Sequence, residues 1–430
     1  MDNRTEANNY PDQDNMERVS GLQSTLGQNL NTSLRVTFGI FLFSSTFSIA
    51  VSQIALGLSL GLYLALTLKT KQPFLSDSVK PISILIIIYV GWLALSSLAG
   101  NTAIASLWTL REEWLFLAIP IAFFVFRGDQ ATERILPVLA TGLCLITIYG
   151  IIQHFTSAHW FRDDPVATAG GLVRLSGNFC HPLTYGNFIV TATLFVLGYL
   201  TRRYARLTTL PRLIYIIASL TGLVAISLLN SRGPMLAAVA SLLFLALLAR
   251  RLRYLLPVLI GCLLISIWLS PGLVDVFSKR FARDLESTDP HSRLYIWNNA
   301  VDIISDNPVF GVGPGNFETA YVHQITTAPE PHYPMGHAHS DYLNIAAVAG
   351  LPGLLAYLAV WILILKRFLA TSRNREATAP GPALAFGALV ASVGFMVSSL
   401  TEATFADEEV RQLLMAIWGA GLVGVGSTQE

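Results

Sequence analysis

Long apolar runs separated by short polar segments dominate this chain. A helix needs about 20 apolar residues to cross the hydrocarbon core of a bilayer. By that measure the pattern predicts twelve spans, and only "VSQ" (51–53) separates the first two; if these were one helix, every later assignment of sides would be reversed. The twelve predicted spans lie at residues 34–50, 53–68, 81–99, 112–126, 134–154, 183–200, 211–229, 234–249, 254–272, 342–365, 381–400 and 411–426.

Composition supports the same interpretation. Of the 430 residues, 53% are hydrophobic and only 13% are charged, whereas soluble domains carry about a quarter of charged residues. The chain is therefore predicted to be an all-α polytopic membrane protein. A net charge of +1 gives no indication of a nucleic-acid partner, and three scattered cysteines provide neither a disulfide framework nor a zinc-binding spacing.

The distribution of basic residues predicts which side each loop faces. Most of the 28 lysines and arginines fall in alternate loops, as expected if those loops are cytoplasmic. Residues 1–33 then form a disordered cytoplasmic tail, 34–272 contain spans 1–9, 273–340 form one large periplasmic loop, 341–426 contain spans 10–12, and 427–430 end in the cytoplasm. No apolar segment near Met1 suggests a cleaved signal.

The large loop is expected to contain a helix within residues 283–308. Ser292 or Asp289 can cap its start, and Pro308 follows its end. Its apolar positions have helical spacing: Leu294, Trp297, Ala300, Val301 and Ile304. Further on, "GVGPGNF" (311–317) is better interpreted as a tight turn than as a dinucleotide-binding loop, because no strand–helix unit surrounds it.

Among the basic residues on the predicted outer side, three arginines break the charge pattern at informative places, next to predicted spans or within the large loop: Arg174, Arg232 and Arg293. An arginine inside a membrane costs about 2.5–3.5 kcal/mol on insertion scales and usually marks a functional site. The alternative is that each side chain reaches the interface or a lipid phosphate. "REEW" (111–114) also places two carboxylates on the outer side, where a metal site, a base and simple capping all stay open.

Polar residues precede three spans that run inward from the outer face. Arg174 precedes the sixth span, Arg232 the eighth, and His337 and His339 the tenth, while Pro234 suits a first helical turn. Helix N-termini carry partial positive charge and free N–H groups that bind anions. If the three ends converge, they form a pocket for a phosphate or diphosphate.

The stretch "MGHAHSDYLN" (335–344) suggests a general base. A helix N-terminus disfavours a charged imidazole, so His337 or His339 should stay neutral and be able to accept a proton. Asp341 could orient one ring. A zinc site would need more ligands; the loop offers His291, His323 and His332 but no acidic cluster. We therefore predict no metal, and a purely structural polar edge stays the third alternative.

Together these segments resemble a known family. "RLSGNFCHP", "SRGPML", "SRLYIWNNAVDIISDNPVFGVGPGNF" and "HAHSDYLNIAAVAGLPGLLAYL", from about Arg174 to Tyr357, are similar to the signatures of the O-antigen ligase and polymerase superfamily. The two histidines and the short "SRG" turn are most similar to O-antigen ligases. The resemblance implies a GT-C-like glycosyltransferase of the bacterial inner membrane that needs no cofactor or metal. Such enzymes transfer a polysaccharide from undecaprenyl diphosphate to a sugar hydroxyl of lipid A-core, so both are expected partners together with membrane lipids.

Carried over residue by residue, the resemblance assigns Arg174, Arg232 and Arg293 to the donor diphosphate. His339 or His337 becomes the base, with His339 preferred because it is closer to the helix start. A polymerase and a protein O-oligosaccharyltransferase of the same superfamily remain alternatives. A flippase or transporter is the non-enzyme alternative, although the polar residues gather at one face and the spans carry almost no charge near their centres.

Overall fold

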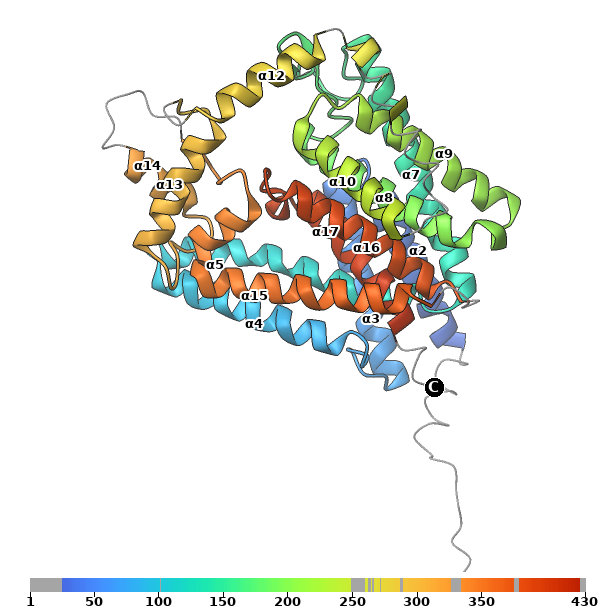
Figure 1. Ribbon diagram of the computed structural model, residues 1–430. Helices are drawn as coiled ribbons and strands as arrows, with labels where there is room; N and C mark the ends of the chain where they lie inside the picture. The colour runs from blue at the N-terminus through green and yellow to red at the C-terminus, as the bar shows by residue number, and fades with distance from the viewer. Residues whose placement is uncertain are drawn as a thin grey trace, which may run out of the picture.

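Helices make up almost all of the regular structure in the computed structural model (Figure 1). The structure describes residues 25–100, 102–248, 260–261, 264, 267–270, 272–286, 289–325, 334–374 and 379–425. Most of the predicted N-terminal tail and most of the predicted ninth span (254–272) lie outside these residues. The longer helices are α2 (Thr25–Ser44), α3 (Ile49–Thr70), α4 (Lys80–Ala99), α7 (Asp129–Thr156), α8 (Pro182–Arg203), α9 (Thr209–Ser227), α10 (Arg232–Leu248), α15 (Asp341–Ser372), α16 (Gly381–Ser398) and α17 (Glu408–Leu422).

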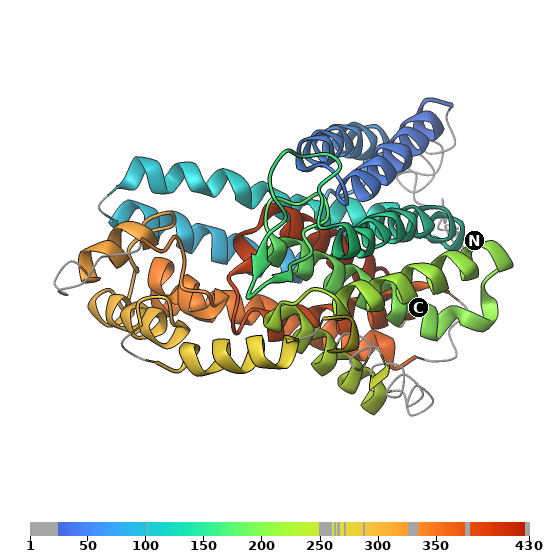
Figure 2. The same ribbon diagram turned by 90° about the horizontal axis from the view of Figure 1, so that it is seen from above.

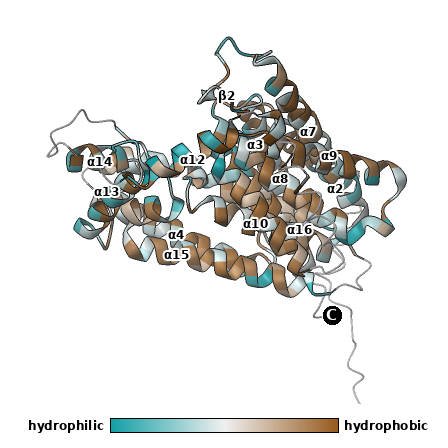
Figure 3. Ribbon diagram, turned by 45° about the horizontal axis from the view of Figure 1, so that its top comes forward, coloured by the Kyte–Doolittle hydropathy of each residue, from teal (hydrophilic) through white to brown (hydrophobic). Residues whose placement is uncertain are grey.

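Shorter elements connect these helices. They are α5 (Ala103–Thr109), η1 (Leu110–Leu117), α6 (Ala118–Val125), β1 (Thr168–Ala169), β2 (Leu172–Val173), η2 (Tyr204–Arg206), α12 (Leu273–Asp284), α13 (Arg293–Asp306), α14 (Phe317–Ile325), η4 (Thr404–Ala406) and η5 (Val423–Val425). Coloured by hydropathy, α12, α13 and α14 mix hydrophilic and hydrophobic residues, whereas the long helices are largely apolar (Figure 3).

The first two apolar runs are separate helices. α2 begins at Thr25, ahead of the predicted start at residue 34. It ends at Ser44 and α3 begins at Ile49, so the break between the two helices comes before "VSQ" and not at it. Ser48 caps α3 by accepting a hydrogen bond from the backbone N–H of Val51 at 3.4 Å. α2 and α3 pack on each other at one edge of the molecule (Figure 2). The first two apolar runs are therefore two helices, as the predicted assignment of loops to the two sides of the membrane requires.

Seven of the described helices are long and apolar enough to cross a membrane, and α10 is a shorter apolar helix. This supports an all-α polytopic membrane protein. The predicted fourth span (112–126) is divided between η1 and α6, and the predicted last span (411–426) between α17 and η5. The total of twelve membrane spans stays a prediction.

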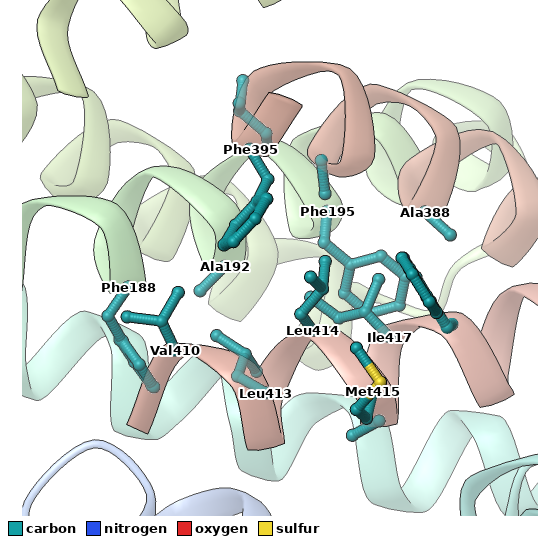
Figure 4. Packing of buried hydrophobic residues seen from close by; sticks show 14 of the residues in the cluster. Phe188, Ala192, Phe195, Ala388, Phe395, Val410, Leu413, Leu414, Met415 and Ile417 are labelled. Carbon is teal, nitrogen blue, oxygen red and sulfur yellow. The ribbon is translucent and has the colours of Figure 1, made fainter. Parts of the chain in front are cut away.

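The helices α8 and α16 form the centre of the molecule. In their most apolar windows, 94% of α8 and 83% of α16 are buried. Their backbones meet at two glycines, where a Cβ added to Gly198 would lie 2.7 Å from the Cα of Gly387. Side chains of α8, α16 and α17 interdigitate beside this contact, including Phe195, Phe395 and Leu414 (Figure 4). This core holds α8 and α16 in place, and with them the polar segments at their ends.

Helix α15 is broken at Gly350, about a third of the way along its length, and the predicted turn "GVGPGNF" lies against the break. Gly350 has the left-handed backbone angles φ 70° and ψ 179°, and Pro352 lacks an N–H. The loop supplies the missing hydrogen bonds: Val312 N donates to Ala347 O at 2.9 Å, and Leu351 N donates to Pro308 O at 2.8 Å. The turn thus joins the large loop to the helix that follows the histidines.

Helix α13 occupies the predicted position in the large loop. Ser292 caps it by accepting from the backbone N–H of Tyr295 at 3.0 Å. The predicted apolar face was partly wrong, because Val301 is 49% exposed while Ile296 and Ile303 are buried. The buried face is the one that packs on α15, so tertiary contacts rather than apolar spacing alone determine its orientation.

Candidate functional site

A polar cavity of about 270 Å³ lies where the first turns of α8, α10, α13 and α15 come close to the last turns of α12. Among its lining residues are the three arginines predicted from the sequence, together with two more and one of the two histidines. These are Arg174, Arg232, Arg280, Arg283, Arg293 and His339. The helix ends that the sequence analysis expected to converge therefore meet at one cavity.

A short hairpin positions Arg174. Gly170 and Gly171 both have positive φ angles, 59° and 80°, which a tight two-residue turn between antiparallel strands requires. Arg174 extends β2, since its backbone N–H donates to Ala167 O at 2.8 Å. Its guanidinium then donates to Ser231 Oγ at 3.0 Å. The hairpin therefore carries Arg174 to the start of α10.

The turn before α10 fixes Arg232. Asn230 adopts φ 51° and donates from its side chain to Val173 O at 2.7 Å, which ties this turn to the hairpin. Arg232 forms an ion pair with Asp284 at the end of α12, with Nη2 and Oδ2 2.5 Å apart. Asp284 also lies 3.9 Å from Nε of Arg293, so one carboxylate lies between two of the predicted arginines.

Glu402 holds the third predicted arginine. Its carboxylate is 2% exposed and lies 2.6 Å from Nη2 of Arg293. The Nη1 atom of Arg293 donates to the backbone oxygen of Thr401. Burial raises the pKa of Glu402, but the neighbouring His339 ring and the Arg293 guanidinium together outweigh that effect and hold the pKa below its ordinary value. Glu402 is therefore a buried anion at the edge of the cavity.

The two histidines occupy different positions. His339 lines the cavity, and its Nδ1 lies 3.9 Å from Oε2 of Glu402, somewhat beyond hydrogen-bonding distance. His337 lies behind it: the ring centroids are 4.5 Å apart, and Nδ1 of His337 accepts the backbone N–H of His339 at 3.2 Å. Burial, reinforced by the neighbouring His339, lowers the pKa of His337 to about 4. His337 is thus neutral near pH 7.

The suggestion that Asp341 orients a histidine is wrong. Its buried carboxylate accepts a hydrogen bond from Ser399 Oγ at 2.6 Å and another from the backbone N–H of Phe405 at 3.0 Å. The chain turns at His339, which has φ 48°, and this turn sends the Asp341 side chain toward the α16–α17 connection. Glu402 is the carboxylate that faces the histidine instead.

Positive charge exceeds negative charge around this cavity. Among the lining residues, five arginines surround two carboxylates, Asp284 and Glu402. The pKa of Arg174 is lowered by burial and by Arg280, and that of Arg280 is lowered by burial and by Arg232. Burial is the larger cause in both cases, and the part of the lowering that comes from the neighbouring arginine reflects repulsion between the two cations. A bound anion with several oxygens would relieve this repulsion and accept hydrogen bonds from the guanidinium groups.

Sequence reasoning missed several lining residues: Arg280, Arg283, Asp284, His181 and Glu402. The two arginines carried a usable signal, because they also lie in the predicted outer loop and violate the same charge rule. His181 caps α8, since its Nδ1 accepts the N–H of Leu183 at 3.2 Å. Glu402 was one of several acids in "TEATFADEE" (401–409), and nothing in that run distinguished it from its neighbours.

The other polar candidates have different positions. Glu112 and Glu113 of "REEW" form ion pairs with Arg411 of α17 at 3.4 and 2.9 Å, which favours a structural role for them. His291 lines the cavity, His323 lines a different one, and His332 lies outside the described residues. Within the part of the chain that the structure describes, no group of three or more His, Cys, Asp or Glu side chains is arranged to hold a metal ion.

Comparison with protein-family models gives a match within the chain. Residues 217–358 match a family model described as O-antigen ligase. This segment contains Arg232, Arg293, His337 and His339, whereas Arg174 and Glu402 lie outside it. No curated protein matches the chain. The match supports the O-antigen ligase superfamily for this chain, as its motifs predicted.

Proposed function

We propose that the protein is an O-antigen ligase. It would transfer O-antigen polysaccharide from undecaprenyl diphosphate to a sugar hydroxyl of lipid A-core at the periplasmic face of the bacterial inner membrane. The observation that carries the proposal is the cavity in which five arginines surround His339, with Glu402 behind the ring. A cationic site beside a histidine suits a reaction in which a diphosphate leaves and a hydroxyl loses its proton.

In this proposal the arginines bind the donor. Arg174, Arg232 and Arg293 hold the diphosphate oxygens, and Arg280 and Arg283 add positive charge from α12. The same groups stabilise the negative charge that grows on the diphosphate as its bond to the sugar breaks. Because Ser231, Asp284 and Glu402 already hold three of these guanidinium groups, the site needs little rearrangement to bind an anion.

His339 is the proposed base. The acceptor hydroxyl oxygen attacks the anomeric carbon of the donor, the bond from that carbon to the diphosphate oxygen breaks, and undecaprenyl diphosphate leaves. His339 takes the hydroxyl proton through Nε2, while Glu402 faces Nδ1 and stabilises the imidazolium that forms. His337 supports the backbone of His339 through the hydrogen bond at 3.2 Å, so it is a positioning residue.

The membrane arrangement follows from the predicted topology. The cavity lies beside the first turns of α8, α10 and α15, which correspond to the sixth, eighth and tenth predicted spans and would start at the periplasmic face. Both termini would then be cytoplasmic. The donor's lipid tail would stay in the bilayer while its diphosphate reaches the arginines.

The proposal can be tested with purified protein in nanodiscs that contain a lipid-linked O-antigen donor and lipid A-core. Polysaccharide joined to lipid A-core is the expected product, and prior treatment with a strong chelator should not change the yield. Lengthened lipid-linked chains would instead identify a polymerase, glycosylated Ser or Thr a protein O-oligosaccharyltransferase, and unaltered glycan on the opposite leaflet a flippase. Activity lost on chelation and restored by one divalent ion would refute a metal-independent reaction.

A further inference from the structure

A second cavity, of about 390 Å³, lies at the opposite end of α13 from the cationic cavity. Arg293, the first residue of α13, lines the cationic cavity, and Asp306, its last residue, lines the second one. With 14 residues and a rise of 1.5 Å per residue, α13 places these two ends roughly 20 Å apart. Helices α13, α14 and α5 lie together around this region in Figure 1.

The two cavities differ in chemistry. Among the residues that the structure describes, no lysine or arginine lines the second cavity, which makes it a poor site for a phosphate. Its polar lining comes from a carboxylate, side-chain amides, hydroxyls and one imidazole, among them Asp306, Asn307, Gln324, Thr319 and His323. Amides both donate and accept hydrogen bonds, and a carboxylate accepts them. This combination suits a neutral ligand with many hydroxyl groups.

Apolar atoms complete the lining of the second cavity. Ile303 is almost fully buried beside it, and Ala99, Val312 and Ala320 contribute further carbon surface. A sugar ring presents C–H groups on its faces and hydroxyls at its edge. A pocket that combines apolar surface with a few polar groups can therefore hold a sugar ring in a fixed orientation.

Hydrogen bonds keep the polar groups in place. Gln324 of α14 donates to Asp306 of α13 at 2.7 Å. Asn316 donates to Ser106 Oγ and to Val312 O, each at 2.8 Å, and Thr102 donates to its side-chain oxygen. Groups that are held before binding lose less conformational freedom when a ligand arrives. The second cavity is therefore a built site rather than an incidental gap.

We propose that this second cavity binds a segment of the saccharide chain during transfer, away from the diphosphate. The inference rests on the proposed function, which supplies two glycans of suitable chemistry: the polysaccharide of the donor and the core oligosaccharide of the acceptor. Because the lining recognises hydroxyl-rich rings without phosphate, both belong to the same ligand class. The site would orient a long glycan whose reacting end lies roughly one helix length away.

The test uses two glycans freed from lipid and diphosphate: O-antigen polysaccharide and core oligosaccharide. Binding of each to the full-length protein in nanodiscs is measured by isothermal titration and by saturation-transfer NMR. Thr319→Trp fills the cavity from the exposed side of α14 and removes no hydrogen bond described above. It should weaken binding at least tenfold. Asp306→Asn, a milder change at an exposed position, should weaken it by a smaller factor.

The matched control is Glu318→Trp. Glu318 is the neighbouring exposed residue on α14 and does not line the cavity, so this variant should bind as the wild type does. Binding of either glycan that Thr319→Trp weakens and Glu318→Trp preserves supports the proposal, and the glycan that responds identifies the source. The proposal is overturned if neither glycan binds the wild type, or if Thr319→Trp binds as tightly. Because no transfer is measured, failure here is distinct from failure of the ligase function.

Discussion

The substitution Glu402→Gln tests the proposed link between the base and the donor site. It replaces a carboxylate that is 2% exposed by an amide of nearly the same shape, so packing is preserved while the negative charge is removed. The amide oxygen can still accept from Arg293, whose other bond, to the backbone of Thr401, is unaffected. We therefore expect the variant to fold and to bind donor, but to transfer slowly.

The expected loss follows from the distance between the charges. Two unit charges about 4 Å apart attract by about 4 kcal/mol at an effective dielectric constant of 20, and His339 and Glu402 lie 3.9 Å apart. That full value corresponds to about a thousandfold in rate. The Arg293 guanidinium lies 2.6 Å from the same carboxylate and partly neutralises it, which weakens its attraction for the imidazolium. We therefore expect kcat to fall by about one hundred- to a thousandfold.

The assay is the reconstituted transfer reaction, measured over a range of donor concentrations. Loss of the charge removes the stabilisation of the imidazolium that forms as His339 takes the hydroxyl proton, so kcat should fall while the KM for the donor changes little. A purely structural effect would instead weaken donor binding and lower the temperature of thermal unfolding. Glu318→Gln, which removes a carboxylate from the exposed surface of α14, is the control. Wild-type kcat in Glu402→Gln would refute the reasoning.

Three further predictions address the arginines, the histidines and the broken helix. Arg232→Lys should impair transfer severely, because lysine lacks the planar guanidinium that can bind two oxygens at once. Arg232→Ala should weaken donor binding about ten- to a hundredfold, which corresponds to the loss of a charge-assisted hydrogen bond of about 1.5–3 kcal/mol, with acceptor binding little changed. Unaltered donor affinity in folded protein would remove Arg232 from the site. His339→Ala and His337→Ala should not both retain transfer, with the larger loss at His339, and full activity in both would exclude these two histidines as the base. Gly350→Ala should destabilise the protein by about 1–3 kcal/mol in thermal unfolding, because φ is 70° and the new Cβ would overlap the docked loop; Gly91→Ala, where a Cβ meets nothing within 4 Å, is its control.

Local signals in the sequence predicted much of the fold. Apolar runs located most of the long helices, and the capping residue Ser292 together with Pro308 indicated the limits of α13. These predictions succeed because caps and prolines act through hydrogen bonds made within a few residues. The face of α13 was less predictable, because its burial depends on where α15 lies, and no local spacing encodes that position.

The lining of the candidate site was predicted in part. Violations of the charge rule, which can be read at any position in the chain, led to Arg174, Arg232 and Arg293, and all three line the cavity, whereas Arg280 and Arg283 violate the same rule and were not selected. The partner of His339 could not be found in this way. Asp341 is near in sequence, but the left-handed turn at His339 directs it elsewhere, and Glu402 arrives from beyond α16. Only the packing of α15 on α16 brings it close.

The two carboxylates explain how so many arginines can share one small cavity. Without partners, five guanidinium groups would repel one another and lose solvation, and the site would open. Asp284 links Arg232 with Arg293, and Glu402 links Arg293 with the histidine. These two carboxylates hold Arg232 and Arg293 in position, and they neutralise only part of the charge of the five guanidinium groups. The remaining positive charge is available to bind an anion. A bound diphosphate would balance this charge, and the same guanidinium groups would stabilise the negative charge that grows on the diphosphate as its bond to the sugar breaks.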